Sequence, residues 1–303
     1  MWAFLFNEKG GIFLQQNSIC HYLSPDGIRL TAADTSGAAA NAEIIHQMPG
    51  LSAVILAKVM TGAAILANDF KNKEGVTFKW VTGSPLGIIH ADAYDGRFVR
   101  GYEDNPDAGK ELECTLANEA NLVSRNGQLF VTRYSLLKMP YTSAVNLAHG
   151  DVAACLTEYL NLSEQTLSAV NLTVRIDQDG KIIHSSGFLA QLMPGGDLQR
   201  FAEYFRQTDL CWDTAAAEEQ PDSLESLLKK GRFEMLDSAP LDFCCTCSEE
   251  RIHSTLLTLP ETEKEDLLKD PSIEIVCHYC GKTYRIERDV LKKWFAENRG
   301  GLC

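Results

Sequence analysis

Four cysteines near the end of the chain, arranged as two close pairs, constrain its fold more than any other feature. The first pair has the spacing C-x-C, the second has C-x-x-C, and 29 residues separate them; the four are Cys245, Cys247, Cys277 and Cys280. Two thiolates from each of two tight turns provide the four ligands of a tetrahedral Zn²⁺ site. Gly281, directly after the second pair, suits a turn whose backbone N–H groups point toward a thiolate. The spacing predicts one zinc ion per chain on these four residues in the reduced state.

The C-x-C pair distinguishes this motif from structural zinc ribbons, which usually carry two C-x-x-C pairs. A disulfide between Cys245 and Cys247 closes a very small ring, and strained or exposed disulfides are the labile, regulatory ones. The sequence therefore indicates two states, four thiolates on zinc or two local disulfides without it. Cys244, beside the first ligand, could compete with Cys245 for the metal, and His253 and His278 are less favoured substitute ligands.

This arrangement resembles the redox switch of the heat shock protein 33 family, the bacterial holdase chaperones that oxidation activates. The residues beside the cysteines also stand in the family's usual places; they are Phe243, Ser248, Glu250 and Arg251. Four earlier strings resemble family segments in the same order, at residues 83–92, 99–106, 158–165 and 187–195. The resemblance covers roughly residues 26–290, and the chain departs from the family in its N-terminal leader, in Cys244 and in Cys303.

The resemblance implies an ATP-independent chaperone that is not an enzyme and that binds unfolding proteins under oxidative stress. Oxidation would release zinc and form the Cys245–Cys247 and Cys277–Cys280 disulfides, with the second pair responding first. Loss of zinc would unfold the C-terminal module and the helical linker before it. This would expose an apolar client-binding surface that includes residues 201, 204, 205 and 210. The activated chain is expected to form a homodimer.

Composition limits which cellular compartments and which kinds of partner are compatible with this chain. A formal net charge of −13 disfavours a nucleic-acid partner, because phosphate binding needs a basic face. The most apolar segment, residues 51–70, is interrupted by Lys58 and contains Asp69, so no membrane span is expected. The first residues lack the cationic region and the long apolar run of a secretory signal. Ten cysteines without an export signal indicate the reducing cytoplasm.

Mixed helices and hairpins predict an α+β fold with a largely antiparallel sheet and packed helices. Tight hairpin turns are expected at Asp95-Gly96, Asn126-Gly127 and Asp179-Gly180. Buried or amphipathic helices are expected at residues 51–68 and 150–160. Residues 1–24 form a leader of uncertain role, for which we expect an extra strand and a turn around Gly10-Gly11.

Three parts of the chain follow from these elements. They are an N-terminal α+β chaperone core at 1–193, an acidic helical linker at 194–242, and a small zinc-binding redox-switch domain at 243–303. The first boundary is Pro194-Gly195-Gly196, and the linker contains expected helices at residues 197–207 and 223–230. Helices this short are marginal alone, so the linker can exchange between docked and undocked states.

Two other function classes remain open on the residues alone. A constitutive zinc ribbon associated with nucleic acid is disfavoured by the negative charge and by the C-x-C pair. A thiol–disulfide oxidoreductase needs its C-x-x-C at a helix N-terminus, whereas Cys277 and Cys280 precede a strand-like segment at 283–286. No phosphate-binding loop, G-x-S-x-G or H-E-x-x-H motif occurs, so nothing indicates ATP use or a catalytic pocket.

Overall fold

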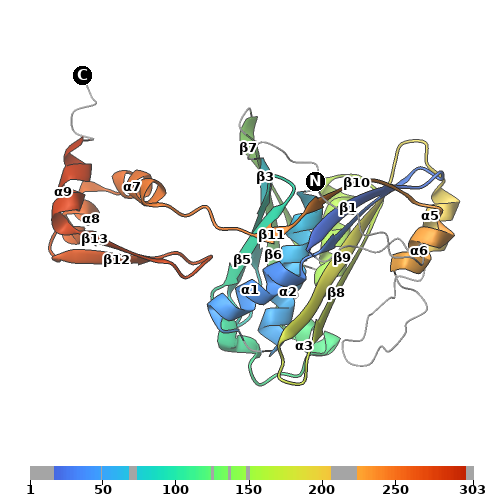
Figure 1. Cartoon of the computed structure of the whole chain (residues 1–303), viewed down its shortest axis with the longest axis horizontal. Coiled ribbons are helices and arrows are strands. Elements are labelled where there is room, and N and C mark those ends of the chain that lie inside the picture. The colour runs from blue at the N-terminus through green and yellow to red at the C-terminus, as the bar shows by residue number, and fades with distance from the viewer. Residues whose placement is uncertain are drawn as a thin grey trace, which may run out of the picture. The chain divides into compact units, whose positions relative to one another are not determined.

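The computed structural model describes residues 17–48, 50–67, 74–123, 126–135, 138–147, 151–205 and 224–297. The chain divides into two compact units, Met1–Cys244 and Cys245–Cys303. Figure 1 traces the elements of each unit along the chain. Among the helices described, none is both long and apolar enough to cross a membrane.

The first unit contains a five-stranded antiparallel sheet. Its strands lie in the order β10 (Glu234–Pro240), β1 (Ser18–Leu23), β2 (Ile28–Asp34), β9 (Ile182–Leu192) and β8 (Ser168–Ile176). The end of the expected leader is therefore a strand, β1, while the expected turn at Gly10-Gly11 lies outside the described residues. Gly180, in the predicted turn between β8 and β9, has φ +76°, a value that favours glycine.

A second sheet of six strands completes the scaffold of this unit. Its order is β11 (Asp242–Phe243), β5 (Phe98–Glu103), β4 (Ile88–Tyr94), β3 (Gly75–Val81), β6 (Gln128–Ser135) and β7 (Lys138–Asn146). All neighbours are antiparallel except β11, which pairs parallel to β5. Asp95 and Gly96 both have positive φ, which matches the tight hairpin predicted between β4 and β5.

The helix α2 (Gly50–Leu66) packs against strands of both sheets, as Figure 1 shows. Every residue from Leu51 to Leu66 is buried, which confirms the predicted buried helix. Alanines such as Ala57 and Ala64 leave room for both sheets to approach the helix backbone. The helices that complete this layer are α1 (Ser36–His46), the 3₁₀ turn η1 (Pro106–Gly109), α3 (Leu116–Val123) and α4 (Val152–Ser163). The predicted α+β class with antiparallel sheets is confirmed.

A second apolar cluster lies on the other face of the five-stranded sheet. Two short helices contribute side chains to this cluster, α5 (Leu198–Phe205) and α6 (Leu224–Lys230). Phe201 and Phe205, one turn apart on α5, pack with Phe188 of β9. The segment expected as a linker, 194–242, thus contributes two helices and the edge strand β10 to the first unit.

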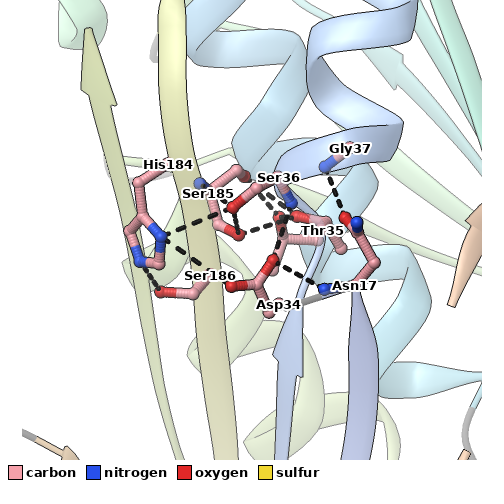
Figure 2. Close-up of polar contacts among 9 residues, drawn as sticks. Asn17, Asp34, Thr35, Ser36, Gly37, His184, Ser185 and Ser186 are labelled. Atoms are coloured by element: carbon pink, nitrogen blue, oxygen red, sulfur yellow. Dashed lines mark hydrogen bonds and ion pairs between the residues drawn. The ribbon is translucent and has the colours of Figure 1, made fainter. Parts of the chain in front are cut away.

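Hydrogen bonds connect Asn17, the residue before β1, to Asp34 and to the start of α1 (Figure 2). The Asp34 carboxylate accepts a hydrogen bond from the backbone N–H of Asn17 at 3.1 Å. The side-chain oxygen of Asn17 accepts one from the N–H of Gly37 at 2.6 Å. Thr35, which precedes the helix, donates instead to the Ser185 hydroxyl of β9 at 2.9 Å. The first turn of α1 therefore obtains its caps from Asn17, directly before β1, and from Asp34 rather than from its own N-cap residue, Thr35.

The second unit is small. It comprises α7 (Glu249–Leu257), α8 (Glu261–Leu267), the hairpin of β12 (Ser272–Val276) and β13 (Thr283–Glu287), and α9 (Arg288–Glu297). Among its described residues, four buried apolar side chains form a cluster against which partly buried ones pack; the four are Leu256, Ile286, Leu291 and Phe295. So small a core contributes little folding free energy, and a cross-link is the usual compensation.

Glu103, the last residue of β5, generates a prediction about stability. Its side chain is buried, neither carboxylate oxygen has a hydrogen-bond partner among the described residues, and burial raises its pKa well above the ordinary value. The folded state then holds a proton that the unfolded chain releases. The free energy of unfolding is therefore highest below the ordinary pKa of a glutamate and falls as the pH rises above that value.

We expect Glu103→Gln to stabilise the first unit at pH 8 by about 1 kcal/mol, a rise in Tm of about 2–4 °C. The gain should shrink toward pH 4. Thermal unfolding followed by circular dichroism across this range measures both effects. Asp107→Asn, which removes an exposed carboxylate of η1, is the matched control and should leave the pH profile unchanged. A parallel loss of stability with pH in Glu103→Gln and in the unaltered chain would contradict the assignment.

Candidate metal centre

The four paired cysteines come together in the second unit. Cys245 and Cys247 lie in the segment that leads into α7, and Cys277 and Cys280 lie in the turn between β12 and β13. Their four Sγ atoms all lie within 4.8 Å of one another, and each side chain is partly buried. The closest sulfurs belong to opposite pairs, with Cys245 and Cys277 at 3.6 Å and Cys247 and Cys280 at 3.5 Å.

These distances fit a metal better than a disulfide. Zn–S bonds of about 2.3 Å in a tetrahedron place sulfurs about 3.8 Å apart. A disulfide requires about 2.05 Å, so the closest sulfur pairs, at 3.5 and 3.6 Å, are separate thiols. Four cysteine sulfurs are also the donor set that zinc prefers in structural sites. The four cysteines are therefore placed to hold a metal ion.

Local sequence builds both cysteine turns. In the second, the N–H of Cys277 bonds to the Lys282 carbonyl at 2.9 Å and the N–H of Gly281 bonds to the Cys277 carbonyl at 2.8 Å. Gly281 has φ +68°, which explains why glycine follows the second pair. In the first cysteine turn, the Ser248 hydroxyl accepts a hydrogen bond from the N–H of Arg251 and so caps α7 directly after Cys247. The Arg251 guanidinium donates to the carbonyl of Thr246 at 3.2 Å, between the two cysteines.

Tyr284 of β13 is a member of the site that sequence reasoning missed. Its hydroxyl lies 3.1 Å from Cys247 Sγ and donates to it. The ring is buried, and the Lys282 ammonium lies 4.5 Å from its centroid. No spacing rule marks a tyrosine four residues after a C-x-x-C pair, so only the register of the hairpin identifies it.

The thiols differ in how readily they ionise. Burial acts to raise the pKa of Cys247, but hydrogen bonds from Tyr284 and the neighbouring cysteines outweigh it and bring the pKa down to about 7. Burial raises the pKa of Cys277, and raises that of Cys280 to about 12. Cys247 thus ionises at lower pH than either thiol of the second pair, while a bound metal would keep all four deprotonated.

The other candidate ligands lie apart from this group. Cys244 belongs to the first unit, where its N–H bonds to the Val99 carbonyl at 3.3 Å and its carbonyl accepts the Tyr94 hydroxyl at 2.9 Å. His253 stacks on Trp294, with ring centroids 4.6 Å apart. Within the described residues, the four-sulfur group includes neither His253 nor His278. Cys303 lies outside the described residues.

Comparison with known proteins gives consistent matches over most of the chain. The family model described as Hsp33 protein matches residues 17–287. A protein named 33 kDa chaperonin from Geobacillus kaustophilus is 32% identical over 272 residues, covering 88% of this chain and 92% of that protein. Another protein of that name, from Thermus thermophilus, is 34% identical over 296 residues, covering 91% and 85%.

A solved structure has a similar fold. It is the crystal structure of the 33 kDa chaperonin, an Hsp33 homolog, from Thermotoga maritima. The TM-score is 0.80 at 24% identity, over 94% of this chain and 100% of that chain. At this identity the similarity establishes the arrangement of the elements, and it agrees with the α+β architecture described above.

Substitution of single cysteines tests the ligand set. We expect serine at position 245, 247, 277 or 280 to abolish tight zinc binding, because three thiolates leave the tetrahedral set incomplete. Cys244→Ser is the matched control and should retain about one ion per chain. Metal analysis of the purified reduced proteins measures the stoichiometry. A Cys244→Ser protein without zinc, beside a Cys245→Ser protein that retains it, would overturn the assignment.

The Tyr284 hydroxyl should strengthen metal binding by orienting Cys247 and stabilising its charge. Groups hydrogen-bonded to metal ligands typically change affinity by about 10–100-fold, so we expect Tyr284→Phe to weaken zinc binding at least about tenfold. Competition with a chromogenic chelator measures the change. Tyr141→Phe, on an exposed tyrosine of β7, controls for loss of a hydroxyl elsewhere. Equal affinity in both variants would remove Tyr284 from the site.

Proposed function

Because this chain belongs to the Hsp33 family, whose members are chaperones rather than enzymes, we propose that it is an ATP-independent holdase activated by oxidation. The family resemblance found in the sequence is confirmed by these matches. The observation that carries the redox proposal is the group of four cysteine sulfurs in a unit with a small apolar core. The centre would act as the sensor, and unfolding proteins would be the clients.

The four cysteines account for the sensing chemistry. Bound Zn²⁺ would cross-link the two cysteine turns and keep the sulfurs nucleophilic at neutral pH. On oxidation, the two thiolates of each pair would lose two electrons to one molecule of hydrogen peroxide, which takes up two protons from solvent; one S–S bond and two molecules of water would form. The proposed bonds are Cys245–Cys247 and Cys277–Cys280. Disulfide sulfurs are no longer thiolate ligands, so the module loses its cross-link.

The pairing of the disulfides needs a direct test. The closest sulfurs in the structure belong to opposite pairs, while the local pairing rests on the family resemblance. Both local disulfides would leave the two turns free of one another, whereas cross-pair disulfides would keep them joined. Only the local pairing therefore unfolds the module.

Unfolding of the module would then reach the segment 194–242. Its helices, α5 and α6, have eight and seven residues, lengths at which packing rather than intrinsic propensity maintains a helix. Their release would expose Phe201, Tyr204 and Phe205 together with the sheet face beneath them. Contiguous apolar surface of this kind is what a holdase needs to bind a client without nucleotide. Leu210, also expected there, lies outside the described residues.

Two further features belong to the same proposal. The oxidised chain would form a homodimer, because newly exposed apolar surface also favours self-association. The protein would act in the cytoplasm, where a reducing environment keeps ten cysteines available until stress occurs. The net charge of −13 argues against nucleic acid as a partner.

The two alternative functions have less support. An oxidoreductase needs its C-x-x-C at the start of a helix, whereas Cys277 and Cys280 lie in the hairpin between β12 and β13. A constitutive zinc ribbon would not respond to peroxide. Catalytic turnover of a small dithiol would favour an oxidoreductase, and zinc retained under peroxide would favour a constitutive zinc ribbon.

The activation mechanism predicts coupled changes on treatment with peroxide. We expect zinc release, the two local disulfides on peptide mapping, and suppression of aggregation of a heat-unfolded client, all reversed by a thiol reductant. Amide hydrogen exchange should lose protection beyond about residue 197 and retain it in 26–190, because the first unit keeps its core around α2.

The Cys277→Ser/Cys280→Ser protein is the control and should show none of the reversible gain in activity. Protection that stays equal in the two redox states of an active chaperone would rule out unfolding as the mechanism. Mapping that found mainly cross-pair bonds would exclude the proposed switch.

A further inference from the structure

Three polar side chains of β9 and β2 lie together in Figure 2. His184 and Ser186 are two residues apart on β9 and therefore point to the same face of the sheet, and Asp34 of β2 is the cross-strand partner of Ser186. His184 Nε2 lies 2.8 Å from the Ser186 hydroxyl, and His184 Nδ1 lies 3.8 Å from the Asp34 carboxylate. A hydroxyl, an imidazole and a carboxylate thus occur in the order that activates a serine as a nucleophile.

The Asp34 carboxylate is fixed through one of its oxygens and faces His184 with the other. Its Oδ1 accepts the backbone N–H groups of Asn17 at 3.1 Å and of Ser36 at 3.0 Å, whereas Oδ2 is the oxygen nearest His184 Nδ1. A carboxylate only accepts hydrogen bonds, so it favours the tautomer with the proton on Nδ1. The Ser36 hydroxyl, 3.4 Å from Nδ1, can accept the same proton. Nε2 is then unprotonated and faces the Ser186 hydroxyl as a base.

His184 is available as a base at neutral pH. Burial lowers its pKa, the Asp34 carboxylate acts in the opposite direction, and Arg175 of β8 lowers the pKa further. Asp34 and Arg175 are the charged groups that act on the imidazole from the two strands beside β9. The His184 side chain is 35% exposed and Ser186 is only partly buried, so a small molecule can reach the hydroxyl.

Arg175 defines the charge of a suitable reactant. It is the cross-strand partner of His184, so its side chain lies on the same face of the sheet, and it is exposed. A guanidinium attracts anions and suits the geometry of a phosphate group. Among activated acyl compounds, acyl phosphates carry their negative charge on the leaving group. The site therefore favours an acyl phosphate over a neutral ester.

We propose that Ser186 is an acylation site that accepts the acyl group of a small acyl phosphate. The Ser186 oxygen attacks the carbonyl carbon while His184 Nε2 takes the hydroxyl proton. A bond forms between the serine oxygen and the carbonyl carbon, the bond from that carbon to the phosphate oxygen breaks, and the leaving phosphate takes up the proton from His184. The products are an O-acylserine and inorganic phosphate. The chain itself is modified, and the reaction does not involve the four cysteines.

Acylation kinetics of the reduced, zinc-loaded full chain test the site. The probe is acetyl phosphate, and peptide mapping by mass spectrometry measures the rate at which each serine is acetylated. Ser238 of β10, an exposed serine of the same sheet, is the internal reference. General base catalysis typically contributes about 10²–10⁴-fold, so we expect Ser186 to react at least about 100-fold faster than Ser238. Equal rates at the two serines would overturn the proposal, and this comparison needs no variant.

Substitutions assign the roles of the neighbouring side chains. His184→Gln removes the base and should slow acetylation of Ser186 at least about 100-fold. His21→Gln is the matched control, because His21 of β1 also lies beside a hydroxyl, that of Thr31 at 3.3 Å. Arg175→Gln should slow the reaction with acetyl phosphate but not that with neutral p-nitrophenyl acetate. Circular dichroism and zinc content verify the fold of each variant, and a folded His184→Gln protein that reacts as fast as the control would exclude His184 as the base.

The pH dependence separates a histidine base from direct attack by hydroxide-generated alkoxide. With His184 as the base, the acetylation rate of Ser186 rises as the imidazole loses its proton and then levels off. Burial and Arg175 place this rise below the ordinary pKa of histidine. A rate that rises in proportion to hydroxide concentration throughout would contradict base catalysis by His184, and with it the proposed site.

Discussion

The second unit depends on what joins its four cysteine sulfurs, because its apolar core is too small to hold it alone. Among the described residues, the buried apolar cluster of this unit consists of Leu256, Ile286, Leu291 and Phe295. A structural zinc ion can supply roughly 10–16 kcal/mol of apparent binding free energy, comparable to the whole stability of a typical domain. Under the proposed function, chemistry at the sulfurs would therefore decide whether this unit is folded, and a redox signal would become a folding transition.

The first unit, in contrast, has an extensive apolar core. Its core surrounds α2, which both sheets cover, and this core has no need of a metal. The helices α5 and α6 belong to a separate cluster on the outer face of the five-stranded sheet. Their loss would expose that face while leaving the α2 core in place. The unit can thus act as a stable scaffold that carries removable parts.

Backbone that the first unit holds is followed directly by the four-cysteine group. Cys244 is hydrogen-bonded to Val99 and Tyr94 of the first unit, and the next residue, Cys245, is one of the four clustered thiols. Under the proposed function, a change in bonding at Cys245 would therefore begin one residue after backbone that is hydrogen-bonded to β5 and β4.

The sequence by itself determined what depends on local spacing: the paired cysteines, the Asp95-Gly96 hairpin and the buried helix α2, because a turn or a helix is encoded within a few residues. It left Cys244 beside Cys245 as a competitor, marked no role for Tyr284 and could not show that residues 234–240 pair with β1. Tertiary structure decided these points. Tyr284 and Cys247 are more than thirty residues apart in the sequence, and β10 and β1 are more than two hundred residues apart.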